Sequence, residues 1–242
     1  MRKNLLFSLA VLTAGSLLAA DSSPKDDVTA AATVLGAQKN YSWKTTVEVG
    51  NNSPFKPGPT EGKTEKDGYT TLSLSFNDNT SEALIKGTNA AVKTADGGWQ
   101  SAAEAAANSS GGGGFNPAMF IVRMAQNFKT PAVEAASLAA QASELKAGTN
   151  GISGDLTEAG AKSLLTFRRG GNGGGGPAIN NAKGSVTFWI AGGKLTKYQY
   201  HVSGTVSFNG NDRDVDRTTT TEIKDVNSTK IDASDEAKKK LE

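Results

Sequence analysis

The chain has 242 residues, with 26 Lys and Arg against 24 Asp and Glu, and a formal net charge of +2. It contains no Cys and a single His, which excludes disulfides, thiolate chemistry and metal sites built from several Cys or His side chains. No basic run interrupts the body of the chain, so we expect no nucleic-acid binding, which needs a basic face.

The first 20 residues (1–20) are typical of a cleaved export signal. Arg2 and Lys3 give a positive start, Leu5–Ala20 carry no charge, and small residues precede Asp21. The uncharged stretch is shorter than the roughly 20 residues of a membrane-spanning helix, although an uncleaved anchor remains an alternative. A lipid-modified anchor is excluded, because that attachment needs a cysteine. We therefore expect a periplasmic or secreted protein whose residues 21–242 form a single domain.

A short helix and a series of strands come next. Ser23-Pro24 is typical of a helix start, and apolar residues spaced by three and four then form one face up to Gly36. Residues 50–60 are expected to be a polar loop, and Asp67-Gly68 is a strong hairpin signal. The alternating patterns predict strands over 41–49, 61–66, 69–76, 82–86 and 90–94.

The middle of the chain, at about 101–169, is predicted to be a helical insertion. Capping residues and apolar spacing predict helices over 101–108, 117–128, 131–146 and 157–169. The second of these is apolar around most of its circumference, so it must lie against a large hydrophobic surface. Residues 170–176 hold six glycines and one Asn and are expected to be a flexible segment.

Strands return towards the C-terminus. Alternation predicts strands over 186–190, 198–208 and 213–224, with Asn209-Gly210 as a hairpin turn, and Ser234 caps a last short helix. Runs of strands separated by a helical block indicate an α+β fold. We expect a curved antiparallel sheet, or half-barrel, with the helical block packed on its concave face.

Several short segments follow the order seen in a known family. They are Asn40-Tyr41-Ser42-Trp43, Lys66-Asp67-Gly68-Tyr69, Gly97-Gly98-Trp99, Val186–Ile190, Leu195–Tyr198 and Ile231 before Ala237–Leu241. The chain thereby resembles the exported lipoprotein-carrier (LolA-like) superfamily, which has an unclosed β-barrel plugged by helices. Relatives include mycobacterial-type lipoglycan carriers and sensors of envelope stress. The glycine tracts depart from this pattern, and no functional residue of the family transfers to a specific position.

Few residues suggest catalysis or cofactor binding. His201 alternates outward on its strand, and no Gly-x-Ser-x-Gly elbow accompanies it. The glycines of 170–176 follow a helix and precede a strand, the wrong order for a phosphate loop. Asp212, Asp214 and Asp216 are spaced as calcium ligands can be, but interleaved arginines favour a solvated strand face. We therefore expect a protein that is not an enzyme and has no cofactor.

The remaining candidate site is a set of apolar and aromatic side chains, whose alternative role is an ordinary core. Methionines in the helix over 117–128 suit packing around a variable apolar guest. The candidate ligand-binding residues are Trp43, Val47, Leu72, Leu74, Phe76, Phe120, Met124, Phe128, Phe188, Tyr198 and Tyr200. We expect an exported carrier for a hydrophobic small molecule or acylated protein, with transient membrane contact. The alternative is an envelope-stress sensor or scaffold that binds an envelope protein partner.

Overall fold

The computed structural model describes residues 22–50, 57–76, 79–94, 97–109, 117–166, 177–208 and 210–242. The predicted export signal (1–20), the glycine segment (170–176) and Asn209 lie outside the described residues. None of the helices formed by the described residues is long and apolar enough to cross a membrane.

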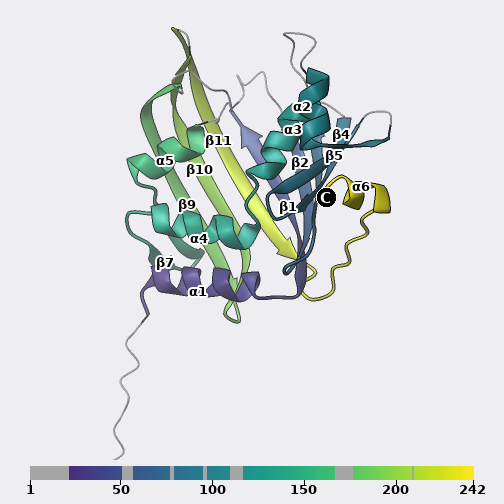
Figure 1. The fold of residues 1–242 in the computed structure, drawn as a ribbon. Helices are drawn as coiled ribbons and strands as arrows, with labels where there is room; N and C mark the ends of the chain where they lie inside the picture. The colour runs from purple at the N-terminus through teal and green to yellow at the C-terminus, as the bar shows by residue number, and fades with distance from the viewer. Residues whose placement is uncertain are drawn as a thin grey trace, which may run out of the picture.

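Eleven strands of the described chain form one antiparallel sheet, in the order β6-β5-β4-β3-β2-β1-β11-β10-β9-β8-β7 (Figure 1). Their bounds are β1 Asn40–Val49, β2 Pro57–Glu65, β3 Thr70–Phe76, β4 Asn79–Lys86, β5 Asn89–Lys93, β6 Trp99–Ser101, β7 Lys146–Gly148, β8 Gly151–Asp155, β9 Ala178–Ala191, β10 Lys194–Phe208 and β11 Asn211–Lys224. The sheet curves but ends in two edge strands, β6 and β7, so it is not closed. This confirms the predicted α+β half-barrel.

Five of the six helices that the described residues form cover the concave side in two groups. The helices are α1 Pro24–Gly36, α2 Ala102–Ser109, α3 Pro117–Gln126, α4 Pro131–Gln141, α5 Glu158–Leu165 and, elsewhere, α6 Asp235–Lys239. Helices α1, α4 and α5 pack on β9 and β10, whereas α2 and α3 pack on β4, β5 and β6. Strands β1 and β11 run between the two groups (Figure 1). The predicted position of the helical block on the concave face is therefore confirmed.

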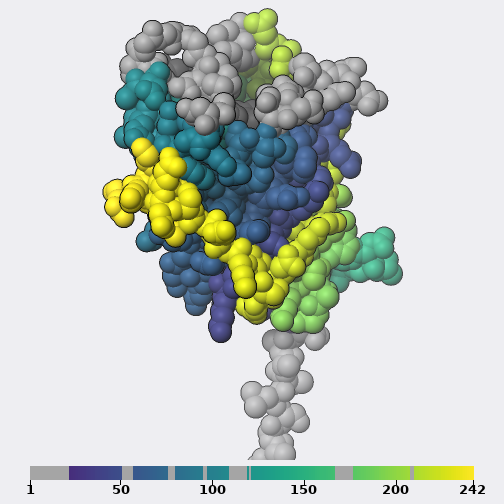
Figure 2. All heavy atoms as spheres, turned by 90° about the vertical axis from the view of Figure 1, so that its right-hand side faces the viewer, coloured from purple at the N-terminus to yellow at the C-terminus, as the bar shows by residue number. Residues whose placement is uncertain are grey.

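Local sequence explains the ends of the helical layer. Ser23 caps α1 in a capping box with Asp26, and the helix buries the predicted apolar face of Val28, Ala31, Ala32 and Leu35. Ser234 caps α6, which packs on the opposite, convex face of the sheet. There Ala237 and Leu241 meet Leu84 and Ala91, and the C-terminal segment crosses the outside of the molecule (Figure 2).

Two local predictions were wrong. The helix expected to reach residue 146 ends at Gln141, and the strands β7 and β8 follow it. Strand β8 forms because it pairs with β9, a contact distant in sequence that local composition does not reveal. The polar loop expected over 50–60 is in part strand, since β2 begins at Pro57. A register shift between Pro57 and Thr60 accommodates the proline there.

Candidate functional site

The centre of the concave face is formed by β1, β11 and β10, whose register aligns their inward side chains in rows. Successive rows are Thr45–Thr221–Tyr198, Val47–Thr219–Tyr200 and Val49–Arg217–Val202. Most of the first two rows is polar, although it lies at the middle of the sheet. The concave face is therefore amphipathic rather than uniformly apolar.

A carboxylate from α4 lies over these polar rows. The Tyr198 hydroxyl donates a hydrogen bond to Glu134 and also bonds with Thr221. The hydroxyls of Thr221 and Thr45 are 2.8 Å apart, and Tyr200 bonds with Thr219. We call Glu134, Tyr198, Tyr200, Thr219 and Thr221 the polar cluster. Its hydrogen bonds link α4 to three strands of the sheet.

Burial dominates the electrostatics of the polar cluster. It raises the pKa of Glu134, against the Tyr198 hydrogen bond and the charges of Lys129 and Arg217, which lower it. Burial and the nearby Glu134 charge raise the pKa of Tyr200 to about 12 and hold that of Tyr198 well above its usual value. The two tyrosines therefore remain neutral hydrogen-bonding groups at physiological pH.

Arg217 extends the polar cluster towards α5. Its guanidinium donates to the carbonyl oxygen of Leu164, in the last turn of that helix. The last carbonyls of a helix lack partners within it, so this bond caps α5. Leu165 packs directly above β10, where a Cβ on Gly204 would lie 2.8 Å from its Cδ1. Arg217 thus holds α5 beside the cluster.

An aromatic stack lies on the other side of the centre of the concave face, between β1 and the α3–α4 connection. Trp43 lies parallel to Phe128, with ring centroids 5.6 Å apart, and Tyr41 packs beside it at 5.8 Å. Gly62 leaves room for the indole, because a Cβ there would lie 2.0 Å from the Trp43 ring. The Tyr41 hydroxyl bonds with Thr130 at the start of α4, and burial raises its pKa. The stack therefore fixes the α3–α4 connection on the sheet.

Apolar side chains between the two helix groups are only half-buried. Val47, Val49, Val206 and Val215 all point to the concave side, yet each keeps part of its surface accessible. On the same face of β10, Val202 under the helices is fully buried. We call these four valines the valine strip. It adjoins the polar cluster, because Val47 pairs with Thr219.

The structure disperses the predicted ligand-binding residues over several environments. The buried ones are Trp43, Leu72, Phe188, Tyr198 and Tyr200; the half-buried ones are Val47, Leu74 and Phe128. Met124 is 40% exposed on the outer side of α3. The side chains of Phe76 and Phe120 lie outside the described part of the structure. The role of the whole predicted set in ligand binding remains a prediction. The set did not include the polar residues that lie at the centre of the concave face.

Those polar residues carry weak sequence signals. Glu134 is a lone carboxylate in an Ala-rich helix, one residue before the buried Ala135. Thr219 and Thr221 belong to a run of four threonines, whose identical side chains hide the alternation between the two faces. Of these residues, only Glu134 carried a usable sequence signal, because a carboxylate next to the apolar face of a helix indicates a buried polar site.

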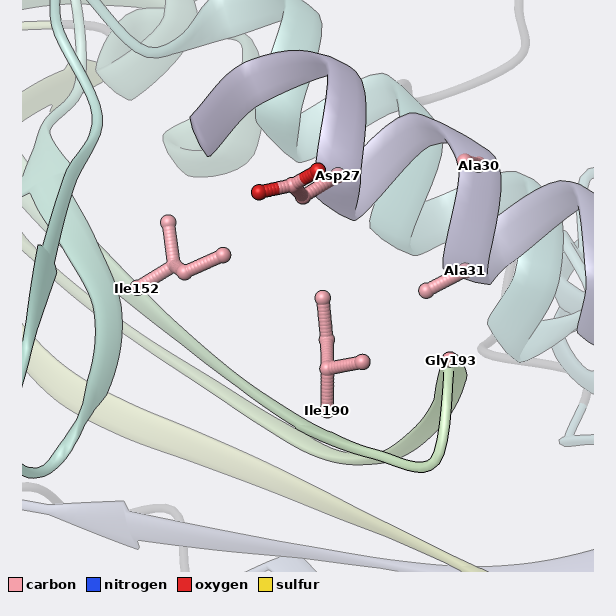
Figure 3. A pocket seen from close by; sticks show the side chains of 6 residues that line it. All are labelled: Asp27, Ala30, Ala31, Ile152, Ile190 and Gly193. Atoms are coloured by element: carbon pink, nitrogen blue, oxygen red, sulfur yellow. The ribbon is translucent and has the colours of Figure 1, made fainter. Parts of the chain in front are cut away.

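A pocket lies under α1. Its volume is about 340 Å³, and Asp27, Ala30, Ala31, Ile152, Ile190 and Gly193 line it (Figure 3). Asp27 and the two isoleucines point towards a common space, and the Ser22 hydroxyl donates to the Asp27 carboxylate. One carboxylate beside apolar side chains offers neither a catalytic pair nor a set of metal ligands.

The convex side of the sheet carries His201 and the three aspartates whose roles in catalysis and calcium binding the sequence raised. His201 is exposed and lies 3.1 Å from Asp216 on the neighbouring strand. Asp214 and Asp212 accept hydrogen bonds from Thr205 and Ser207, which forms a ladder along the hairpin. The described residues contain no group of three or more His, Asp or Glu side chains that could hold a metal ion. The ladder fits the expected solvated strand face.

Comparisons with known proteins bear on the fold. Neither models of known protein families nor curated proteins match the chain. The chain is similar to the lipoprotein LppX of Mycobacterium tuberculosis, with 9% identity and a TM-score of 0.48 over 87% of this chain and 98% of LppX. It is also similar to LprF of Mycobacterium bovis, with 10% identity and a TM-score of 0.43 over 88% of this chain and 97% of LprF. At these values neither protein decides what this chain binds, and membership of the lipoprotein-carrier superfamily remains a prediction.

Proposed function

We propose that the protein is an exported, non-catalytic carrier that holds a lipid-like or acylated ligand on the concave face of its sheet. In this proposal the first 20 residues direct export to the periplasm or the cell exterior and are then removed. One observation carries the binding function: the valine strip stays half-buried between two groups of helices, whereas Val202 on the same face of β10 is fully buried under the helices.

The neighbouring polar cluster favours an amphipathic ligand. An acyl chain would lie along the valine strip, and its polar end would reach the hydroxyls of Tyr198 and Tyr200 and the carboxyl of Glu134. Withdrawing about ten methylenes from water contributes roughly 8 kcal/mol, the binding free energy of a Kd near 1 μM. Hydrophobic burial therefore supplies enough affinity without a catalytic group.

A tryptophan scan across one strand tests this function. Val47 belongs to the valine strip, whereas the adjacent Thr46 is exposed on the convex face, so Val47→Trp and Thr46→Trp place the same side chain on opposite sides of β1. We expect Val47→Trp to fill ligand space and weaken binding of a fluorescent C16 fatty acid at least tenfold. Thr46→Trp should leave the affinity within twofold of the wild type.

Urea denaturation of both variants separates a ligand space from a packed core. A half-empty strip accepts the indole with little loss of stability, while overpacking a full core costs about 1–3 kcal/mol or more. A large stability loss in Val47→Trp, or a wild type without saturable fatty-acid binding, would overturn the carrier function. The alternative sensor or scaffold function would then be favoured.

A further inference from the structure

Three large apolar side chains remain exposed among the described residues, and all lie on the helices of the concave side. Val34 on α1 is 38% exposed, Met124 on α3 is 40% exposed and Val133 on α4 is 55% exposed. Single exposed apolar residues are common on protein surfaces, so their position relative to one another is what matters.

Each of these residues lies near a helix end, and the start of α4 lies close to the other two ends. A Cβ on Gly36 would lie 3.5 Å from that of Ala132, which places the end of α1 against the start of α4. Met124 lies in the last turn of α3, and a short connection leads from there to α4. Lys129 in that connection reaches Ser137, with 3.3 Å between Nζ and Oγ, one helical turn beyond Val133.

The charges around this point are positive. Arg123 and Lys129 are exposed, and neither forms an ion pair with an acidic residue of the described chain. Glu134 is on the same helix as Val133, but its carboxyl turns inward to Tyr198. The acidic residues of α1 are in its first turn, about 10 Å along the axis from Val34. We call Val34, Arg123, Met124, Lys129 and Val133 the helix corner.

We propose that the helix corner docks the protein on a membrane surface rich in anionic lipids. Its three apolar side chains insert among the lipid headgroups, and its two cations attract their charge. Arg123 and Met124 suit either kind of surface, but Lys129 and the lack of an aromatic side chain in the helix corner favour a bilayer, because the centres of protein interfaces are enriched in aromatic residues and depleted of Lys. This proposal goes beyond carrier function: it identifies where the protein meets a bilayer, whatever it binds.

Co-sedimentation with lipid vesicles tests the docking. Vesicles of phosphatidylcholine that contain roughly 30% phosphatidylglycerol, which gives them a negative surface potential, are compared with pure phosphatidylcholine vesicles. Each Lys or Arg near an anionic surface contributes about 1 kcal/mol, or roughly fivefold in partitioning. Lys129→Glu should therefore weaken binding to the anionic vesicles about 25-fold. Lys183→Glu, the same change at an exposed position on the convex face, is the matched control and should stay within threefold.

The apolar contribution is measured with Val133→Ser, which removes two methyl groups and should reduce partitioning about tenfold. Val133 is exposed, so the variant should fold normally, which a thermal melt checks. The proposal is overturned if the wild type prefers neither vesicle, or if Lys183→Glu weakens binding as much as Lys129→Glu does. Fatty-acid titration of the same samples tests the carrier function separately. Variants of the helix corner that no longer bind vesicles should still bind the fatty acid, because they leave the valine strip unchanged.

Discussion

Gly62 provides the sharpest test of how the centre of the sheet is built. The substitution Gly62→Ala adds a methyl group 2.0 Å from Cζ2 and 2.3 Å from Cε2 of Trp43. Carbon atoms in contact lie about 3.5–4.0 Å apart, so the indole must move by more than 1 Å. Trp43 is only 3% exposed and stacks on Phe128, so a shift of the indole disturbs that aromatic pair.

The expected loss of stability follows from two costs. Overpacking a full core costs about 1–3 kcal/mol, and losing an aromatic pair costs about 0.5–1.5 kcal/mol. We expect Gly62→Ala to lower the free energy of unfolding by about 2–4 kcal/mol. With a urea dependence near 3 kcal/mol per molar, the midpoint of denaturation should fall by about 1 M. Circular dichroism during urea titration measures this.

Two controls isolate the contact with the indole. Gly50→Ala at the end of β1 meets its nearest atoms at 3.8 Å and 3.9 Å, an ordinary contact, and should change stability by less than about 0.5 kcal/mol. In a Trp43→Leu background, Gly62→Ala should cost less than about 1 kcal/mol, because the ring it displaces is gone. Equal costs of Gly62→Ala with and without Trp43 would refute the reasoning.

Two further predictions concern the polar cluster and the N-terminus. Burial raises the pKa of Glu134 above 4.5, so the folded protein binds the carboxyl proton more tightly than the unfolded chain does. The contribution of this group to stability is therefore complete below pH 4.5. It is lost as pH rises through the raised pKa. Urea titrations between pH 4 and 7 should therefore show Glu134→Gln becoming more stable relative to the wild type as pH rises, and a constant difference would contradict the burial of this carboxyl. N-terminal sequencing of the protein recovered from outside the cytoplasm should begin at Asp21 or within two residues of it; an intact Met1 in the membrane fraction would contradict cleavage.

The sheet could be predicted from local sequence because its hairpins carry their own signals. Asp67 adopts a positive φ of 57° in the turn between β2 and β3, a conformation that Asp and Asn tolerate better than most residues. Gly192 and Gly193 have positive φ values of 56° and 71° and join β9 to β10 in a two-residue turn. Alternation over 41–49 then fixed which side chains face inward.

Elements that depend on distant partners could not be predicted in this way. Strands β7 and β8 are three and five residues long, and their Ala, Gly and Ser content gives no strand signal. They are strands because Gly151–Asp155 lies beside β9 and completes its edge. The stop of α4 at Gln141 has the same origin: Ala142 leaves the helix and bridges to Leu156.

The candidate site shows the same limit in its chemistry. Aromatic residues were predicted from composition and alternation, and Tyr198 does lie at the centre of the concave face. The polar character of that centre arises only from register and packing, which bring Thr45 to Thr221 across 176 residues and Glu134 to Tyr198 across 64. Buried hydroxyls and a carboxyl cost free energy unless each finds a partner, and here they find one another. A ligand that displaced these hydrogen bonds would have to replace them, which an amphipathic molecule can do, whereas a pure hydrocarbon could lie beside the valine strip only by leaving them intact.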